Sequence, residues 1–342
     1  MVCSGQEIWC KPELTDLSLI SVMLAFIERL TLPVIAAPMM RVSGIELVSA
    51  ACQAGVVGAF PTPNARDFSE LASWLQRLDS EAAMARDAGR QPGPYCPNLI
   101  MRRDPDHLRQ AAQLFVQHRT EVVITSVGSP HTVLPVLRDG GVKVLCDVAS
   151  MRHVEKALEL GVDGLVLLTA GAGGNTGWAN PFAFVRAVRR IYDGPVVLAG
   201  GVSDGVALRA ALALGCTLVN VGTRFIATRE SMASTDYKRM LVESSLDDVV
   251  LTRALTGLSS NWLRGSLVAS GIDPDHLDEG ISVEAARQNY GRGNGSGRPE
   301  RWSGIWSAGH SVSGVEDVPS TAEVVCRMKN EFEQDRAAVS CA

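Results

Sequence analysis

The sequence predicts an α/β fold, a closed (β/α)8 TIM barrel with a C-terminal helical subdomain. First, short β-branched runs alternate with helix-patterned stretches, which indicates βαβ units and a parallel sheet. Second, these runs are continuously apolar, as in strands that are covered on both faces. Third, the first run ends in Pro38-Met39-Met40 and lacks the GxGxxG turn of an open doubly wound sheet, the competing architecture.

The predicted strands and helices follow one another in a regular order. The strands are expected over residues 33–37, 56–60, 95–99, 121–125, 142–147, 163–168, 195–199 and 217–221. The helices between them are expected over residues 45–53, 68–78, 107–118, 132–138, 152–159, 181–191 and 206–214. Gly141, Gly161 and Gly215 follow three of these helices, where a left-handed cap is favoured. This spacing fits a barrel, whose usual length is about 250 residues.

The domain organisation follows from where the pattern changes. Residues 31–227 plus 305–342 are expected to form the barrel with its C-terminal helix, an amphipathic segment over 321–337 that docks back. Residues 228–304 are expected to form a small helical subdomain, in which the glycine-rich stretch 289–301 is a surface loop or a gating segment. Residues 1–30 are an N-terminal helical extension. Its segment 17–29 has two open roles, a plug at the bottom of the barrel or a contact in a homodimer.

Composition excludes several classes of protein. The chain has 342 residues, of which 46% are hydrophobic and 20% charged, which is typical of a soluble globular protein. A net charge of −5 without a Lys/Arg-rich run argues against nucleic acid as a partner. Residues 17–25 are too short an apolar stretch to span a membrane and lack the features of a signal peptide, so a cytoplasmic location is expected.

The cysteines and histidines give no metal or disulfide pattern. The 8 cysteines include no CxxC pair, and Cys52, Cys146 and Cys216 lie in apolar segments. Reduced, buried cysteines are therefore expected rather than a disulfide framework. No two histidines have metal-ligand spacing, so no metal is predicted.

Two loops predict an anion site. In barrels of this kind, the loops after strands 7 and 8 often bind phosphate at the carboxyl ends of the strands. Here the seventh predicted strand runs into Gly200-Gly201, and the eighth runs into Gly222-Thr223. Glycines allow an anion to approach backbone N–H groups closely. The alternative is that both loops are tight turns without a ligand.

A third glycine-rich loop follows the sixth predicted strand. Residues 169–177 contain Gly171, Gly173 and Gly174 and then present Asn175. This loop suits a flat contact with a planar ligand, because glycine backbone can approach a ring closely. Asn98, at the end of the third predicted strand, is placed to hydrogen-bond the same ligand, although an Asn there is often only a turn former.

Taken in order, these motifs carry a resemblance to a known family. They are PVIAAPMM (33–40), NLI (98–100), GVKVLCDVASMRHVEKALELGVDGLVL (141–167), GAGGNTG (171–177), PVVLAGGVSDG (195–205) and GTRFIAT (222–228). The set resembles the nitronate monooxygenase (2-nitropropane dioxygenase) family of FMN-dependent barrels, which is related to flavin-dependent enoyl-acyl-carrier-protein reductases. The resemblance implies a non-covalent FMN. Its phosphate would lie on Gly200, Gly201, Gly222 and Thr223, and its ring would be held by Pro38, Met39, Met40, Asn98, Ala170, Gly171, Gly173 and Gly174.

The chain departs from the family at the expected catalytic position. Where the family usually has GGHxG, this sequence has GGNTG, with Asn175 in place of the histidine. An amide accepts no proton in the useful pH range, so Asn175 could orient a substrate or hydrogen-bond an anion but not act as a base. Three outcomes remain: the enzyme takes nitronates that have already lost a proton, another histidine serves as the base, or the fold catalyses a different flavin reaction.

Other side chains are candidates for the site. His310 lies in a segment that resembles the stretch returning to the flavin in the family, and His131 follows the fourth predicted strand. His153 is expected to be structural. Asp147 is either directed into the cavity or the N-cap of the next helix. Trp178 and Trp262 are either walls of a substrate pocket or ordinary core.

Three functions therefore compete. The first is a flavin monooxygenase that oxidises alkyl nitronates with O2. The second is an NAD(P)H-dependent flavin reductase of an enoyl thioester, enone or quinone. The third is a barrel without flavin that binds a phosphorylated metabolite.

Overall fold

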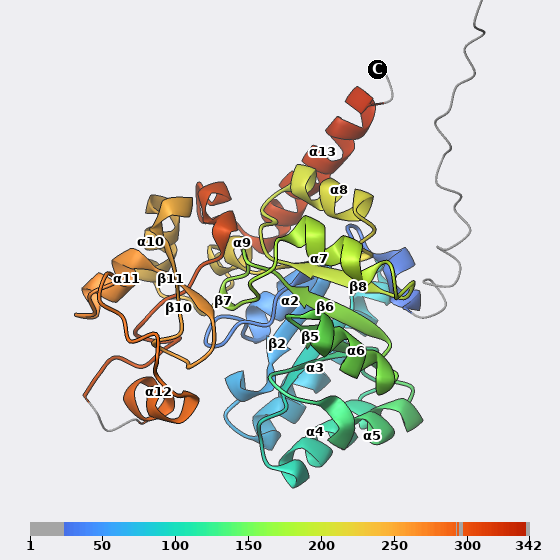
Figure 1. The fold of residues 1–342 in the computed structure, drawn as a ribbon. Coiled ribbons are helices and arrows are strands. Elements are labelled where there is room, and N and C mark those ends of the chain that lie inside the picture. Colours follow the sequence, from blue (N-terminus) through green and yellow to red (C-terminus); the bar gives the residue numbers. More distant parts are fainter. Residues whose placement is uncertain (1–23, 292, 294–296, 340–342) are drawn as a thin grey trace, which may run out of the picture.

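The computed structural model describes residues 24–291, 293 and 297–339, with side chains described as far as Gln334. Within this part of the chain, eight parallel strands form a closed barrel in the order β1-β2-β3-β4-β5-β6-β8-β9 (Figure 1). They are β1 (Val34–Ala36), β2 (Val57–Pro61), β3 (Tyr95–Ile100), β4 (Val122–Ser126), β5 (Lys143–Val148), β6 (Gly164–Leu168), β8 (Val196–Ala199) and β9 (Leu218–Val221). The predicted barrel is confirmed.

Helices surround the barrel, and most of them start at a polar cap. They are α2 (Ile45–Gln53), α3 (Phe68–Asp87), α4 (Pro105–Gln117), α5 (Leu134–Asp139), α6 (Met151–Glu159), α7 (Pro181–Val188) and α8 (Gly205–Ala213). The Asp67 side chain accepts a hydrogen bond from the Glu70 backbone N–H at the start of α3, and Ser150 and Asp204 cap α6 and α8 in the same way. Gly141, Gly161 and Gly215 have φ values of +74°, +70° and +103°, as their predicted capping positions require.

The barrel interior is a separate apolar cluster. Alternate residues of the strands point inward, so each strand contributes every second side chain. The interior side chains include Ile35, Val57, Cys96, Ile124, Leu145, Val166, Val197 and Leu218. Leu24 and Phe26, which precede β1, are 0% and 2% exposed and pack into the same cluster. Of the two roles left open for segment 17–29, its described residues 24–29 therefore act as the plug, and residues 17–23 lie outside the described part.

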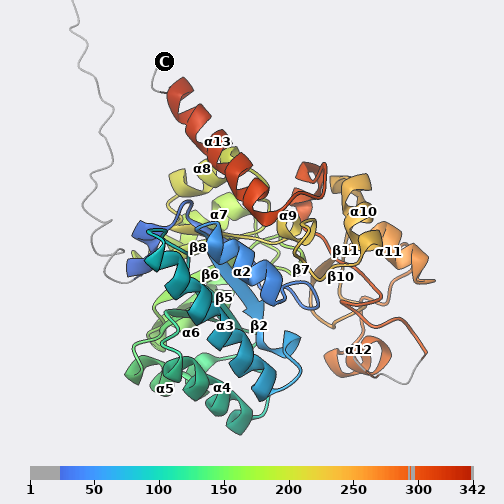
Figure 2. The same cartoon turned by 180° about the vertical axis from the view of Figure 1, so that it is seen from behind.

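The C-terminal helix completes the outer ring. This helix, α13 (Thr321–Val339), corresponds to the predicted segment 321–337 and packs against α8 and α2. It therefore takes the place of the eighth barrel helix, and Figure 2 shows it running across this side of the barrel and projecting beyond it. Arg224, which follows β9, is 6% exposed and donates to Asp317 just before α13, and Asp317 also pairs with Arg327 on α13. Residues between β9 and α13 are thus an insertion in the last βα unit.

The insertion contains helices and also a small sheet that the sequence did not predict. The helices are α9 (Thr223–Ile226), α10 (Thr235–Glu243), α11 (Arg264–Ala269) and α12 (Val283–Tyr290). The sheet pairs β10 (Val249–Thr252) with β11 (Ser260–Leu263), and β11 pairs in turn with β7 (Gly174–Asn175). Since β7 is part of the third glycine loop, the insertion is tied directly to the carboxyl end of the barrel (Figure 1). No helix in the described ranges is long and apolar enough to cross a membrane.

Candidate active site

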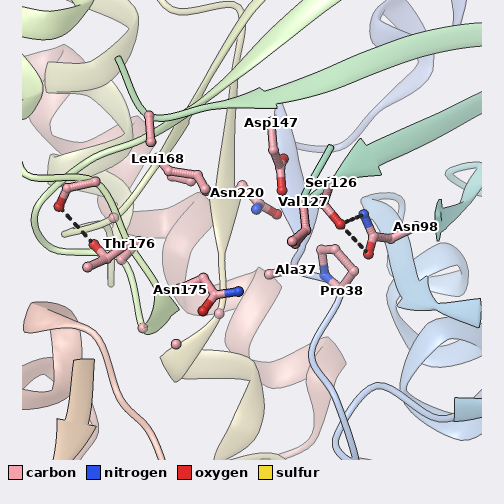
Figure 3. A pocket seen from close by; sticks show the side chains of 18 of the residues that line it. Ala37, Pro38, Asn98, Ser126, Val127, Asp147, Leu168, Asn175, Thr176 and Asn220 are labelled. Carbon is pink, nitrogen blue, oxygen red and sulfur yellow. Dashed lines mark hydrogen bonds between the residues drawn. The ribbon is translucent and has the colours of Figure 1, made fainter. Parts of the chain in front are cut away.

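A cavity of about 800 Å3 opens at the carboxyl ends of the barrel strands. Its floor is the last inward-pointing layer of the barrel, one residue from each strand except β1, for which it is the residue just after the strand. These floor residues are Ala37, Pro61, Asn98, Ser126, Asp147, Leu168, Ala199 and Asn220, most of which are labelled in Figure 3. Each floor residue comes two positions after a residue whose side chain points into the apolar interior of the barrel. The apolar interior therefore ends, and a partly polar surface begins, at the next inward-pointing position.

Asn98 and Ser126 form a polar pair on the floor. The Asn98 amide nitrogen donates to the Ser126 hydroxyl over 3.1 Å, and that hydroxyl donates back to the amide oxygen over 3.2 Å (Figure 3). Asn98 is 5% exposed and its side chain faces the cavity rather than forming a turn. The pair therefore holds the Asn98 amide in one orientation.

The turn after β1 is held by a side chain that sequence reasoning missed. Pro38, Met39 and Met40 line the cavity. Asn64 donates to the Met39 carbonyl over 2.9 Å and accepts from the Arg41 N–H over 2.9 Å, where Arg41 has a φ of +62°. Asn64 follows β2, and nothing in its sequence neighbourhood indicates that it fixes the turn after β1.

The glycine loops form one wall by packing backbone against backbone. Gly200 and Gly201 have φ values of +120° and +79°, which side chains rarely adopt. A Cβ on Gly200 would lie 2.6 Å from the Ala172 nitrogen, and one on Gly173 would lie 2.7 Å from the Gly309 nitrogen. In contrast, a Cβ on Gly201 would meet no atom within 4 Å. The backbone of the neighbouring loop therefore fills the space next to Gly200, whereas the space next to Gly201 is open.

Gly171, Gly174, Gly222 and Thr223 also line the cavity, but Ala170 does not. The expected contact of Ala170 with a ligand is corrected, because this residue lies behind the loop. Its N–H donates to the Ala179 carbonyl, and its own carbonyl accepts from the Asn261 amide over 3.0 Å. The same amide donates to the Ala172 carbonyl over 2.7 Å. Asn261 on β11 is 0% exposed, so it acts as a buried clamp on the third glycine loop.

Asn175 lies on β7 and lines the cavity from the side opposite the floor (Figure 3). Its Oδ1 atom is buried and has no hydrogen-bond partner, and the same holds for Oδ1 of Asn220 on the floor. Buried amide oxygens are usually paired, so two unpaired ones around one cavity indicate a polar ligand there. Thr176, the next residue, is instead fixed by a hydrogen bond from its hydroxyl to the Thr169 carbonyl.

The expected positions of two histidines are corrected. The segment around His310 does return to the site, since its N–H donates to the Gly171 carbonyl over 3.0 Å and Ser307 and Ser311 line the cavity. The His310 side chain, however, is exposed and outside the lining, because it starts a short 3-10 helix that directs it outward. His131 is also exposed and outside the lining, and its ring contacts the Thr132 hydroxyl.

His153, expected to be structural, lines the cavity instead. With Lys156, Ala157 and Leu160 it forms one stripe along α6, because residues three, four and seven apart share a helix face. Trp178 lies at the same outer end and is 80% exposed. The cavity thus extends from the floor to an open groove beside α6.

Trp262 is 0% exposed and stacks on Trp302 in the core of the insertion.

Asp147 is the one floor residue with an ionisable side chain among the described strands. The N-cap of α6 is Ser150, so Asp147 does not cap that helix. Its carboxyl faces the cavity (Figure 3), and no described residue hydrogen-bonds to it. Burial away from bulk water raises its pKa to about 7. No group of three or more His, Cys, Asp or Glu within the described ranges could hold a metal ion.

This chain is similar to known proteins in sequence and in fold. The family model described as nitronate monooxygenase matches residues 75–329. A nitronate monooxygenase of Paraburkholderia phytofirmans is 27% identical over 240 residues, which are 65% of this chain and 63% of that protein. A (3aS,4S,5R,7aS)-5-hydroxy-7a-methyl-1-oxo-octahydro-1H-indene-4-carboxyl-CoA dehydrogenase of Mycobacterium tuberculosis is 28% identical over 243 residues, which are 69% of this chain and 64% of that protein. The chain thus spans a little under two thirds of the length of these relatives.

Solved structures share the fold. FabK from Thermotoga maritima has a TM-score of 0.71 at 22% identity, and the match covers 94% of this chain and 98% of that one. A nitroalkane oxidase from Streptomyces ansochromogenes has a TM-score of 0.70 at 22% identity, covering 92% and 99%. At this identity the likeness concerns the fold alone.

Proposed function

Because this chain belongs to the nitronate monooxygenase family, we propose that it is an FMN-dependent oxidoreductase that oxidises alkyl nitronates with O2. The observation that carries the proposal is the glycine wall, whose φ values and close backbone packing leave an open, side-chain-free space in front of Gly201. Such a space suits a phosphate, because glycine lets an anion come close to backbone N–H groups.

The remaining residues fit the rest of the cofactor. Gly200, Gly201, Gly222 and Thr223 would hold the phosphate, although the Thr223 hydroxyl already accepts from the Gly309 N–H over 2.9 Å. The ring would be held by the 38–40 turn, Asn98 and the glycines at 171, 173 and 174, all of which line one cavity. When bound, FMN supplies the acceptor for electrons from the substrate. A volume of about 800 Å3 is near the upper end for small-molecule pockets, so it leaves room for a substrate beside the cofactor.

Asn175 supports a nitronate as the substrate. Its unpaired Oδ1 and its amide N–H groups offer hydrogen bonds but no basic atom. A nitronate has already lost the α-proton of its parent nitroalkane, so its oxidation needs no base before electron transfer. The Asn175 amide would orient the substrate and hold it in the cavity, next to the glycine loop of residues 169–177.

A second candidate is an NAD(P)H-dependent reductase of an enoyl thioester, enone or quinone. The observation that favours it is the groove beside α6, where Lys156, His153 and the exposed Trp178 extend the cavity outward. A small nitronate does not need this space, whereas a nucleotide or a thioester carrier would use it. A curated relative of similar identity is a carboxyl-CoA dehydrogenase.

The test begins with reconstitution of the purified protein with FMN, followed by its visible spectrum. The reconstituted protein is then mixed without oxygen with ethyl nitronate in one arm and with NADPH or NADH in the other. We expect the nitronate to bleach the flavin rapidly. Rapid bleaching by the nicotinamide with none by the nitronate would replace the first function by the second. Failure to bind FMN at all would leave only a barrel that binds a phosphorylated metabolite.

A further inference from the structure

The Asp147 carboxyl lies between two elements that would hold the flavin ring. In the barrel order, β4 and β5 lie between β3, which carries Asn98, and β6, which leads into the loop 171–174. β5 places Leu145 in the apolar interior, and two residues later the same face of the strand presents the Asp147 carboxyl to the cavity (Figure 3). A ring that contacts both Asn98 and the loop would therefore pass over the part of the floor where Asp147 lies.

The floor around Asp147 carries no positive charge in the described part of the chain. The neighbouring strand ends contribute Ser126 from β4 and Leu168 from β6. The titratable groups that Asp147 affects are the thiols of Cys96 and Cys146, both of which burial keeps protonated. Burial also raises the pKa of the Asp147 carboxyl to about 7, because the charged form is the costly one away from water.

The other titratable side chains of the cavity lie away from the floor. His153 and Lys156 are exposed along the outer groove of α6. The Tyr237 hydroxyl on α10 donates to the Ser307 carbonyl, and burial raises its pKa to about 12. The Asp147 carboxyl thus lacks an ion-pair partner, and near neutral pH both its protonated and its ionised form are present.

The floor has few hydrogen-bond donors to offer a ligand. The Asn98 amide already donates to the Ile124 carbonyl and the Ser126 hydroxyl, and that hydroxyl donates back to the Asn98 oxygen. Asn220 presents an unpaired acceptor, its Oδ1 atom. An oxidised flavin ring has a single N–H donor among several acceptor atoms, so it needs donors from the protein. A protonated Asp147 supplies one, whereas an ionised Asp147 supplies only further acceptors.

We propose that Asp147 is a cofactor-binding residue that donates a hydrogen bond to the flavin ring as a protonated carboxyl, so that FMN binding takes up a proton from water. The ring would also cover the part of the carboxyl that is now exposed to the cavity, which disfavours its charged form further. This inference rests on the proposed function for the cofactor alone, since it requires FMN but no particular substrate.

The first test measures the affinity for FMN at pH 7, 8 and 9 by fluorescence quenching. We expect the wild-type affinity to fall by at least about tenfold over this range, because the free carboxylate must regain a proton on binding. D147N should bind with nearly the same affinity throughout and more tightly than the wild type at pH 9. A phosphate ester ionises near pH 6, so its charge hardly changes over this range.

A matched control removes a carboxylate at the other end of the barrel. Asp139 is exposed and is the last residue of α5, which runs back from the carboxyl ends of the strands. D139N changes the net charge by the same amount as D147N, and it should keep the wild-type dependence on pH. If D139N also loses that dependence, the effect comes from overall charge and the role of Asp147 is overturned.

Two further measurements separate direct donation from a change in charge. D147L keeps a similar shape but has no donor, so it should bind FMN about three- to tenfold more weakly than D147N at pH 7. Calorimetry of FMN binding at pH 8, in two buffers with different heats of ionisation, should show proton uptake by the wild type and none by D147N. Equal affinities of D147N and D147L, or no proton uptake by the wild type, would overturn the proposal.

The same titrations distinguish this inference from the proposed function. A wild type that binds no FMN at any pH rejects the cofactor and this inference with it. FMN binding that stays constant or strengthens from pH 7 to pH 9 rejects this inference alone, since an ionised Asp147 would then face the ring. Weaker binding at high pH together with flavin bleaching by NADPH but not by ethyl nitronate keeps this inference and replaces the nitronate as the substrate.

Discussion

At the scale of single residues, Gly201 gives the sharpest test of the proposed phosphate site. Its φ of +79° and the open space in front of it mean that any side chain there enters the cavity. Gly201→Asp should weaken FMN binding by about 100-fold or more, because a carboxylate opposes the phosphate and blocks its N–H donors; charge-assisted hydrogen bonds contribute about 1.5–3 kcal/mol each. Quenching of FMN fluorescence on titration with protein measures the affinity.

Gly141 offers a closely matched control for this substitution. Its φ is +74°, a Cβ there also meets nothing within 4 Å, and it lies in the exposed loop before β5. Gly141→Asp therefore introduces the same backbone strain and the same charge away from the cavity, and it should bind FMN like the wild type. If both variants bind FMN equally well, the phosphate does not lie at Gly201.

Asp147 also makes a prediction about stability. Its folded-state pKa of about 7 lies above the ordinary value of 3.8, so the folded protein holds this proton more tightly than the unfolded chain does. This group therefore does not lower the free energy of unfolding when the pH is below its unfolded-state pKa. The free energy of unfolding falls as the pH rises from there towards 7. At 1.36 kcal/mol per pKa unit the loss is at most about 4 kcal/mol. D147N should thus be more stable than the wild type at pH 8, with a smaller gap at pH 5, in urea unfolding of the flavin-free protein. The opposite trend would show that the carboxylate is stabilised in the fold.

At the scale of elements, the strands could be predicted from sequence, but of the floor only Asn98 and, as one of two alternatives, Asp147 could be. The strands are apolar on both faces, so their positions are clear from runs such as 163–168. The same property hides the alternation that would show which residues point inward. Asp147 and Asn220 interrupt apolar runs, and this was the available signal, but only the closed barrel shows that both face one cavity. The small sheet was missed because β7 and β11 are far apart in sequence.

This small sheet supports the glycine loop through Asn261. Its amide donates to the carbonyls of Ala170 and Ala172, and the bond to Ala172 is fully buried. Asn261→Ala leaves those two carbonyls unpaired, so we expect a loss of about 1–3 kcal/mol in the free energy of unfolding and weaker FMN binding. Urea unfolding and flavin titration measure the two effects. Asn330→Ala, an exposed position on α13, removes an amide that donates to the Cys326 sulfur and should change neither. Unchanged stability in the Asn261 variant would mean that the insertion does not support the loop.

At the scale of the whole molecule, the barrel depends on a helix that comes after the insertion. α13 fills the eighth position of the outer ring, so the ring closes only when the end of the chain docks between α8 and α2. Arg224 and Asp317 join the loop after β9 to the start of this helix. Since the loop after β9 also carries Gly222 and Thr223, we expect docking of α13 and the shape of the candidate phosphate site to be coupled through this short segment.

Gly205 at the start of α8 allows this docking. Its N–H donates to the Glu331 carboxylate over 2.8 Å, and a Cβ on it would lie 2.3 Å from both the Met328 carbonyl oxygen and the Phe332 nitrogen. Gly205→Ala therefore forces the two helices apart and should cost about 1–3 kcal/mol, the usual penalty for overpacking, although alanine favours a helix. In Gly265→Ala on α11, the new Cβ meets the Met240 sulfur at 3.4 Å, an ordinary contact, so that variant should keep or gain stability.

Urea unfolding and limited proteolysis of α13 distinguish these outcomes. We expect Gly205→Ala to unfold at lower urea and to release its C-terminal helix to protease sooner than Gly265→Ala does. If FMN binding also weakens in Gly205→Ala, the coupling through the segment after β9 is supported, because residue 205 itself does not line the cavity. Equal stability of the two variants would mean that α13 is not an integral part of the barrel, and the last βα unit would then have to close in another way.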